Sequence, residues 1–472
     1  MILRRFYDEP LAQASYLFGC ARTGQAIVVD PLRDVNQYLA AAQMDGVRIV
    51  AVTETHIHAD FLSGTRELVA RTGGVAYLSA EGGPDWQYAF AEADGAVLLR
   101  DGDEIQVGDI RLRALHTPGH TPEHLSFLVT DGSVATTPMG VITGDFVFVG
   151  DVGRPDLLEK AARVEGSAEA GARTLFRSLR KFKALPDHLQ VWPGHGAGSA
   201  CGKNLSAVPQ STVGYEKLYN WGLGTETEDE FMRAVLAEQP EPPRYFAEMK
   251  VRNREGPPLL GALPVPVRLQ PADLAARLDA GAIGVDVRPA ATAAAGRVPG
   301  TLSIPLNKSF TGWVGALLPY DREIVLVTGD GPGARAATSA ARELAMIGLD
   351  RVVAFAGPEM LDWWREQGGE LQVIPSLLPR ELAGREDFTV LDVRRESEWR
   401  SGHVPGVPNI PLQELQERAA EVPAGRPIVL HCQGGGRSHI AASVLQTLGV
   451  DEVVNLSGGF GAWAREGLPV ER

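Results

Sequence analysis

The chain has 472 residues, 44% of them hydrophobic and 22% charged, which is globular material too long for a single hydrophobic core. We therefore expect two to four domains. The formal net charge of -14 argues against nucleic acid or an anionic membrane as the main partner, because such partners need basic charge, and small molecules are the expected ligands.

The N-terminal and cysteine patterns predict a cytoplasmic protein. Residues 1–10 (MILRRFYDEP) contain no apolar signal-peptide core, and no later window is apolar enough for a transmembrane helix. Cys20, Cys201 and Cys432 lie far apart, and an odd number of cysteines in a large chain is typical of a reducing compartment rather than a disulfide framework. Cys20, in SYLFGCA, is expected to be a small core side chain.

The first half of the chain predicts a layered α/β domain. Short apolar runs alternate with amphipathic stretches: AIVVD, RIVAVTETH, RLRALHTPGH, GVITGD and LQVWPGHG. Seven prolines follow between residues 239 and 266, where their fixed φ and missing N–H disfavour regular structure. We therefore expect a first domain over residues 1–245 and a linker over residues 246–265.

An internal repeat of about 105 residues follows the linker and indicates a duplicated small domain. Each copy alternates buried strand runs with helical patterns, which predicts a small parallel sheet covered by helices. The expected copies span residues 266–372 and 373–472. The matching pairs, in chain order, are 285–288 and 391–394, 298–300 and 404–406, 304–306 and 410–412, 324–326 and 428–430, and Trp363 and Trp463.

Side chains with metal-ligand chemistry follow several predicted strands. THIHAD at residues 55–60 comes directly after an apolar run, and His120, Asp145 and His195 each follow another. Because ligand groups gather at strand ends in α/β domains, this ordered set predicts a metal site, although any one of these histidines alone is explained as structural. The order His-x-His-x-Asp, His, Asp, His resembles the metallo-β-lactamase fold, an αββα sandwich.

Phe61 bears on the number of metals. In the dinuclear hydrolases of that superfamily a second histidine follows the aspartate, whereas a phenyl ring cannot coordinate. A second metal would keep only Asp60, Asp145 and His195, so we expect one metal per chain. Two imidazoles and one carboxylate with open positions suit non-haem Fe(II) and oxygen chemistry.

Four motifs resemble the persulfide dioxygenases, which are relatives of glyoxalase II: THIHADF, HTPGHTPEH, TGDFVFVGDVGRPD and the PGHG loop. The resemblance implies one Fe(II) held by His56, His120 and Asp145. It also implies that the persulfide of a low-molecular-weight thiol, such as glutathione or coenzyme A, is oxidised by O2 to sulfite and thiol. Family members usually have a histidine at the place of Phe61. A homo-oligomer, dimer or tetramer, is implied as well.

Several residues near these motifs have alternative interpretations. His58 is either a fourth ligand or a hydrogen-bonding neighbour that fixes the site, and the second role is favoured. Arg154 and Asp156, in GRPD, match a family pattern or form a salt-bridged turn. Cys201, in GAGSACGK with Lys203 nearby to favour the thiolate, either accepts and passes on sulfane sulfur or has no function.

Cys432 begins CQGGGRS directly after the apolar run PIVLH, and a helical pattern follows. The N–H groups of such a loop and the helix dipole lower a cysteine pKa, so the thiolate can accept sulfane sulfur as a persulfide. Arg437 would close this cradle on an anion such as thiosulfate or sulfite. Together with LDVRRESEWRSGHVPGVPNIPL and NLSGGFGAW, the loop resembles rhodanese over residues 373–472.

The first copy of the repeat lacks this cysteine. Thr328, in VLVTGDGPGAR, takes the place of Cys432, and Asp330 stands where an anion would approach. A threonine hydroxyl without a base cannot carry sulfane sulfur, so residues 266–372 are expected to keep a rhodanese-like fold for packing, docking or positioning.

The combined prediction is a sulfide-detoxifying enzyme that oxidises a persulfide to sulfite and carries sulfane sulfur on Cys432, forming or using thiosulfate. One alternative is a dinuclear zinc hydrolase of the glyoxalase II type that cleaves a glutathione thioester. Another is a sulfur carrier or scaffold with a vestigial metal site. Phe61 argues against the first alternative and the complete ligand set against the second, and metal analysis separates all three.

Overall fold

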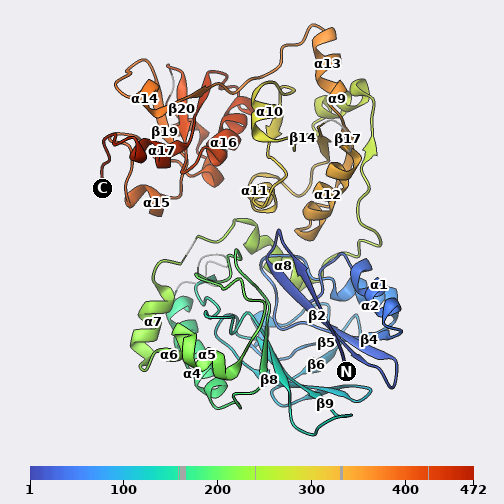
Figure 1. Ribbon diagram of the computed structural model, residues 1–472. Helices are drawn as coiled ribbons and strands as arrows, with labels where there is room; N and C mark the ends of the chain where they lie inside the picture. The colour runs from blue at the N-terminus through green and yellow to red at the C-terminus, as the bar shows by residue number, and fades with distance from the viewer. Residues whose placement is uncertain (158, 160–165, 240, 330–332, 424) are drawn as a thin grey trace. The chain divides into compact units, whose positions relative to one another are not determined.

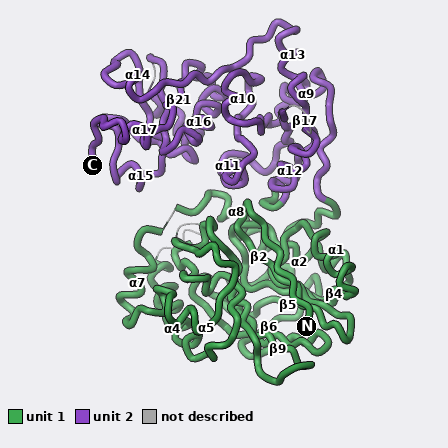
Figure 2. Tube along the Cα trace, in the orientation of Figure 1, with its two compact units in different colours: residues 1–262, 346–348 green, residues 263–345, 349–472 purple. Residues whose placement is uncertain are grey.

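The computed structural model describes residues 1–472 except 158, 160–165, 240, 330–332 and 424, and Figure 1 shows its elements. It divides into two compact units, coloured separately in Figure 2. The first unit contains residues 1–262 and 346–348, and the second contains residues 263–345 and 349–472.

The first unit is built on two six-stranded sheets. In one sheet the order is β1-β2-β3-β4-β5-β6, antiparallel from β1 to β3 and parallel from β3 to β6. Its strands are Ile2–Asp8, Gln13–Cys20, Gln25–Val29, Arg48–Thr53, Val75–Ser79 and Val97–Leu99. The other has the order β12-β11-β10-β9-β8-β7. Its strands from β7 to β12 are Glu104–Val107, Ile110–His116, Leu125–Asp131, Gly140–Gly144, Gln190–Pro193 and Ser211–Thr212.

Hydrophobic clusters between the sheets and on their outer faces hold these sheets in layers. Because side chains alternate along a strand, Phe18 of β2 packs between the sheets on Trp192, whereas its neighbour Leu17 faces the helices on the outer side. Cys20 lies in the core between the sheets, as expected. The covering helices are α1 (Asn36–Met44) and α2 (Thr65–Thr72) on the first sheet, and α4 (Ser167–Lys183), α5 (Val213–Tyr219), α6 (Trp221–Gly224) and α7 (Glu228–Leu236) on the second. The predicted αββα layering is therefore present.

Part of the predicted linker is a helix. Residues Tyr245–Glu255 form α8, because the prolines flank this segment rather than interrupt it. The buried Asn253 side chain donates to the carbonyl oxygens of His58 at 2.8 Å and Phe61 at 2.7 Å, and it accepts the N–H of Ser63 at 2.9 Å. The expectation of irregular structure is therefore wrong for this segment. The helix supports the loop that carries the THIHADF motif.

The second unit contains two parallel sheets, β13-β17-β16-β14-β15 and β18-β21-β20-β19. The four strands of the second sheet follow the same order as the first four of the first sheet, which has β15 in addition. The strands of the first sheet are β13 (Val267–Arg268), β14 (Ile283–Asp286), β15 (Thr301–Ser303), β16 (Ile324–Val327) and β17 (Val352–Ala356). Its helices are α9 (Pro271–Asp279), α10 (Ala290–Ala294), α11 (Phe310–Leu317), α12 (Gly333–Met346) and α13 (Glu359–Glu366). The strands of the second sheet are β18 (Ser376–Leu377), β19 (Thr389–Asp392), β20 (Ile428–His431) and β21 (Val453–Leu456). Its helices are α14 (Pro379–Leu382), α15 (Glu396–Arg400), α16 (Gly436–Thr447) and α17 (Gly459–Arg465).

The repeat extends to individual contacts. Arg288 pairs with Asp286 at 2.6 Å and donates to the Gly296 carbonyl at 2.7 Å. In the second copy Arg394 pairs with Asp392 at 2.7 Å, and its Nη2 likewise donates to a backbone carbonyl eight residues ahead in the chain, at 2.8 Å. All four paired side chains are buried, so both copies fix the turn after their second strand in the same way.

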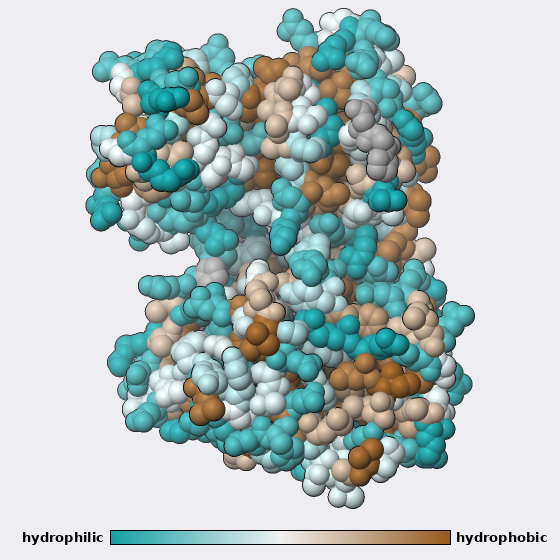
Figure 3. Space-filling view, in the orientation of Figure 1, coloured by the Kyte–Doolittle hydropathy of each residue, from teal (hydrophilic) through white to brown (hydrophobic). Residues whose placement is uncertain are grey.

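Within the part of the chain that the structure describes, no helix combines the length and apolar character needed to cross a membrane. On the face drawn in Figure 3, hydrophobic residues form small, separate groups among hydrophilic ones.

Candidate metal centre and sulfur-transfer loop

Three buried side chains from different strand ends of the first unit converge as a candidate metal centre. His56 follows β4, His120 lies between β8 and β9, and Asp145 follows β10 directly. Asp145 Oδ2 lies 3.9 Å from His56 Nε2 and 3.6 Å from His120 Nε2. These separations are too long for hydrogen bonds, but they leave room for a metal with bonds of about 2.1 Å between the atoms.

The backbone orients the histidine rings for ligation. His120 Nδ1 donates to the Arg154 carbonyl at 2.9 Å, and His195 Nδ1 donates to the Ala12 carbonyl at 3.0 Å, which leaves each Nε2 free to face the cluster. Burial lowers the pKa of His56 and of His120, so both imidazoles are neutral. Both Asp145 carboxylate oxygens are buried without a hydrogen-bond partner. Buried polar atoms of this kind fit a metal ion.

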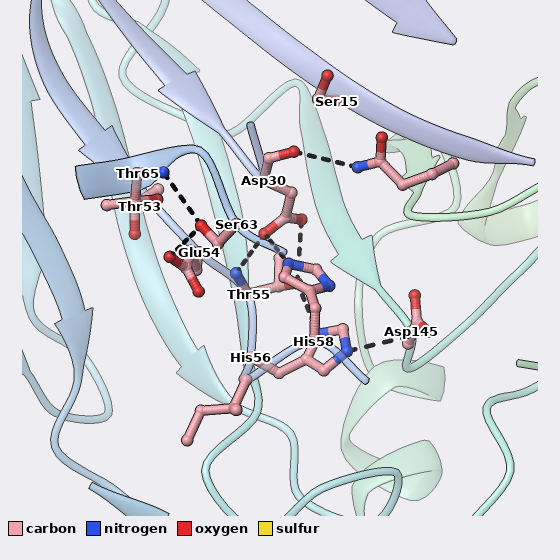
Figure 4. Close-up of polar contacts among 12 residues, drawn as sticks. Ser15, Asp30, Thr53, Glu54, Thr55, His56, His58, Ser63, Thr65 and Asp145 are labelled. Atoms are coloured by element: carbon pink, nitrogen blue, oxygen red, sulfur yellow. Dashed lines mark hydrogen bonds and ion pairs between the residues drawn. The ribbon is translucent and has the colours of Figure 1, made fainter. Parts of the chain in front are cut away.

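Asp30 holds the loop that carries Thr55 and His58, as Figure 4 shows. Its carboxylate accepts the Thr55 N–H at 2.6 Å and contacts His58 Nε2 at 3.1 Å. Burial alone would lower the pKa of His58, but the adjacent Asp30 carboxylate raises it to about 9. The His58 side chain therefore pairs with Asp30, and its ring packs on Phe61 with centroids 4.4 Å apart. The neighbouring His56 points toward Asp145 instead.

A second cluster brings Asp60, His195 and Cys201 together, with their ligand atoms within 4.8 Å of one another. His195 Nε2 lies 3.2 Å from Asp60 Oδ2 and 3.5 Å from Asp145 Oδ2, so the two clusters adjoin. Sequence reasoning assigned Asp60 and His195 to a second metal that Phe61 should weaken. The structure adds the Cys201 thiol to that set, whereas the sequence suggested only that this cysteine lies near the rim of the site, six residues past His195.

Cys201 differs from the expectation of a loop thiolate favoured by Lys203. Its side chain is buried, and burial raises its pKa to about 12, which favours the thiol where no metal is bound. Lys203 Nζ instead donates to the Ala234 carbonyl at 2.5 Å. The proposed activation by Lys203 is therefore wrong.

Arg154 and Asp156 form a buried ion pair with contacts of 2.8 and 2.7 Å. Arg154 also donates to the Ala200 carbonyl at 2.9 Å, while its own carbonyl accepts from His120. The salt-bridged turn therefore connects the loop of one candidate ligand with the residue that precedes Cys201.

His124 is a residue near the centre that sequence reasoning did not single out. Its Nε2 accepts the Asp145 N–H at 3.2 Å, and its ring stacks on His56 with centroids 5.2 Å apart. His124 is the last histidine of the HTPGHTPEH motif, which is the only feature of the motif that could have indicated it. It contacts two candidate metal ligands but is not itself a candidate ligand.

A cavity of about 680 Å³ adjoins the loop of His120 and is lined by Gly119, Trp86, Lys250 and Arg254 among others. Lys250 Nζ lies 3.6 Å from the centroid of the Trp86 ring, and burial lowers the pKa of Lys250 to about 8. Both cationic residues come from α8, inside the predicted linker, where no sequence motif indicated a cavity. Its size suits a small organic ligand.

The Cys432 loop joins β20 to α16, as predicted. The Gly435 N–H donates to Cys432 Sγ at 3.1 Å, and Ser438 Oγ lies 3.5 Å from the same sulfur. Gly435 has φ +96°, a left-handed conformation that favours glycine and lets its N–H turn inward. The arrangement can hold a thiolate or the terminal sulfur of a persulfide.

Arg437, which is expected to close the cradle on an anion, already has a carboxylate partner. It makes a bidentate pair with Glu398 of α15, with contacts of 2.6 and 2.7 Å. An anion that binds Arg437 therefore has to share or displace this carboxylate.

In the first copy, Thr328 is fully buried and donates to the Ala356 carbonyl at 3.2 Å. Its hydroxyl is therefore already engaged in a structural bond. Asp330 lies outside the described residues.

Comparisons with known proteins match both parts of the chain. The metallo-beta-lactamase superfamily profile matches residues 8–195, and the rhodanese-like domain profile matches residues 378–466. The solved structure of a metallo-beta-lactamase from Staphylococcus aureus subsp. aureus COL is 42% identical, covering 76% of this chain and 99% of that one with a TM-score of 0.69.

Curated relatives divide along the same lines. The mitochondrial persulfide dioxygenase ETHE1 of Bos taurus is 28% identical over 240 residues, 50% of this chain and 80% of that protein. A sulfurtransferase of Allochromatium vinosum is 38% identical over 93 residues, 20% of this chain and 87% of that protein. Hydroxyacylglutathione hydrolases are also among the relatives.

Proposed function

The chain belongs to the metallo-β-lactamase superfamily and carries a C-terminal rhodanese-like domain, and we propose that it oxidises a thiol persulfide and transfers sulfane sulfur. In the first reaction, RSSH, O2 and water give RSH, sulfite and two protons. The observation that carries this proposal is the buried set of His56, His120 and Asp145, in which both Asp145 carboxylate oxygens lack a hydrogen-bond partner, in one chain with a cysteine cradle.

We propose that His56, His120 and Asp145 hold one Fe(II). An iron held by these residues would supply oxygen-activating chemistry for a persulfide substrate. The chain's own residues orient the ligands. The Arg154 carbonyl fixes the His120 ring, His124 holds the Asp145 backbone, and the sandwich core excludes bulk water from the cluster.

The 680 Å³ cavity beside His120 is the proposed site for the thiol carrier. Lys250 and Arg254 would bind carboxylate or phosphate groups of glutathione or coenzyme A, while Trp86 packs on the apolar part. The carrier's sulfur then extends along the His120 loop.

The second unit would supply the sulfur-transfer step. The Cys432 thiolate attacks the terminal sulfur of RSSH, whose proton passes to the departing thiol, and the enzyme keeps Cys432–S–S⁻. Attack by sulfite on that outer sulfur gives thiosulfate and restores the thiolate, and the reverse reaction uses thiosulfate. Both steps fit sulfide detoxification. The equivalent strand order of the two sheets supports a second, cysteine-free rhodanese-like fold over residues 266–372.

Cys201 is proposed to accept sulfane sulfur beside the metal centre, because its sulfur lies with Asp60 and His195, and His195 would take the thiol proton when the sulfur attacks. Cys201→Ser keeps the size of the side chain and removes the nucleophile. We expect it to retain iron and to form less sulfite per persulfide consumed. Unchanged sulfite yield would show that Cys201 plays no part in the reaction.

A dinuclear zinc hydrolase is the second candidate, and Cys201 is the observation that favours it. Asp60, His195 and Cys201 would hold a second zinc despite Phe61, since a thiolate is a good zinc ligand.

Metal-loaded protein separates the two candidates. Iron-loaded and zinc-loaded samples would each be given glutathione persulfide in an oxygen electrode and a glutathione thioester in a hydrolysis assay. Oxygen uptake with about one iron per chain supports the dioxygenase. Thioester hydrolysis with about two zinc ions per chain and no oxygen uptake would replace it with the hydrolase.

A further inference from the structure

A cavity of about 410 Å³ in the second unit borders the Cys432 loop and is shared by both copies of the repeat. Gly436 and Arg437, at the start of α16, line one part of it. Most of the remaining lining comes from the cysteine-free copy, including Leu306 and Trp313. The first copy thus shapes the space beside a transfer loop that it does not itself contain.

Buried polar contacts fix the first copy against α16. Ser303 Oγ lies 2.8 Å from His439 Nε2, and the Ser303 N–H donates to Ser443 Oγ at 2.9 Å. Arg297, which is fully buried, bonds Gln446 one turn further along the helix. Such contacts require one defined geometry, so the wall of the cavity is held in register with the helix that follows Cys432.

The size of this cavity exceeds what a small inorganic anion needs. It falls within the range of about 300–1,000 Å³ that is usual for organic ligands.

The charge in this cavity also favours an organic ligand over a small inorganic anion. Arg437 is its cationic side chain, and the carboxylate of Glu398 already neutralises it through two contacts. The wall of the first copy is largely apolar, and Leu306 and Trp313 are among its lining residues. A thiosulfate ion would have to compete with Glu398, whereas an organic thiol carrier can pack on the apolar wall.

We propose that the Cys432 site selects an organic persulfide as its sulfur donor, with the carrier seated in this cavity and Trp313 of the first copy as a specificity-determining residue. The inference rests on the proposed sulfur transfer at Cys432. It gives the cysteine-free copy a role in choosing the donor. The reaction remains the exchange described above, in which RSSH gives RSH and Cys432–S–S⁻.

The experiment measures persulfide formation on Cys432 in the full-length protein without oxygen, so that the dioxygenase reaction cannot consume the donor. Glutathione persulfide and thiosulfate are compared, and the added sulfur is followed by mass spectrometry after rapid alkylation. Wild-type protein is expected to react faster with glutathione persulfide. Trp313→Ala should slow that reaction about tenfold, the usual effect of a lost apolar contact in a specificity pocket, and leave the thiosulfate rate within about twofold.

Two further variants make the test independent of folding. Ala290→Trp places a ring in the cavity and should also slow the organic donor selectively. Glu398→Gln frees Arg437 and should raise the thiosulfate rate about tenfold. Trp364→Ala, in the same copy but outside the cavity lining, is the matched control and should leave the ratio of the two rates unchanged.

The outcomes separate this inference from the proposed function. Equal slowing of both donors in Trp313→Ala, or a wild-type preference for thiosulfate, would refute donor selection while leaving sulfur transfer intact. Failure of Cys432 to gain sulfur from either donor would instead refute the proposed transfer itself.

Discussion

Replacing Asn253 tests whether α8 supports the metal-binding loop. The Asn253 side chain makes three buried hydrogen bonds to residues between His58 and Ser63, at 2.7 to 2.9 Å. Asn253→Ala leaves two carbonyls and one N–H unsatisfied, each costing about 1–3 kcal/mol, so the free energy of unfolding of the first unit should fall by about 3–9 kcal/mol. Because the loop positions His56, iron affinity should fall about 10- to 100-fold.

The assay combines thermal unfolding, hydrogen exchange at residues 56–63 and iron titration. Asn253→Asp is a close match in size that keeps an acceptor for Ser63 but loses both donors, so it should resemble Asn253→Ala. Val251→Ala, on the half-exposed face of the same helix, should change stability by no more than about 0.5 kcal/mol. If Asn253→Ala behaves like Val251→Ala in all three measurements, the supporting role of α8 is refuted.

Three other predictions address the two proposed reactions. Asp145→Asn or His120→Ala should reduce bound iron and persulfide-dependent oxygen uptake to below about a tenth, while anaerobic sulfur transfer to Cys432 persists; loss of both activities would contradict two separate sites. Cys432→Ser should keep oxygen uptake and lose transfer of sulfane sulfur from thiosulfate to cyanide, and residual transfer at the wild-type rate would exclude Cys432. Burial lowers the Lys250 pKa to about 8, so its positive charge is present below that pH and lost above it. The KM for glutathione persulfide should therefore rise as pH increases through about 8, and Lys250→Met should remove this dependence; a wild-type KM that is flat with pH would exclude Lys250 from carrier binding.

The candidate ligands were predictable because each follows an apolar run that forms a strand. His56, Asp145 and His195 come within three residues of a strand end, and parallel or neighbouring strands bring such positions to one edge. The Cys432 cradle was predictable for the same reason, since strand, glycine loop and helix are contiguous in the chain.

Contacts between distant loops were not predictable from these patterns. Cys201 meets Asp60 only through the packing of two loops 141 residues apart, and no periodicity encodes that approach. Glu398, on another helix, neutralises Arg437, and the sequence does not show that these two side chains pair. The helix α8 was not predicted because the prolines on either side of it made the whole segment resemble a linker. An 11-residue helix nevertheless fits between these prolines.

The measurement that tests the central claim most directly is the stoichiometry of oxygen uptake by iron-loaded protein given glutathione persulfide, with sulfite and thiosulfate quantified together. The account predicts about one O2 consumed for each sulfite formed, counting sulfite recovered as thiosulfate, and no uptake by Asp145→Asn. Iron-loaded protein that consumes no O2 with either glutathione or coenzyme A persulfide would contradict the account and leave Cys432 as the proposed sulfur site.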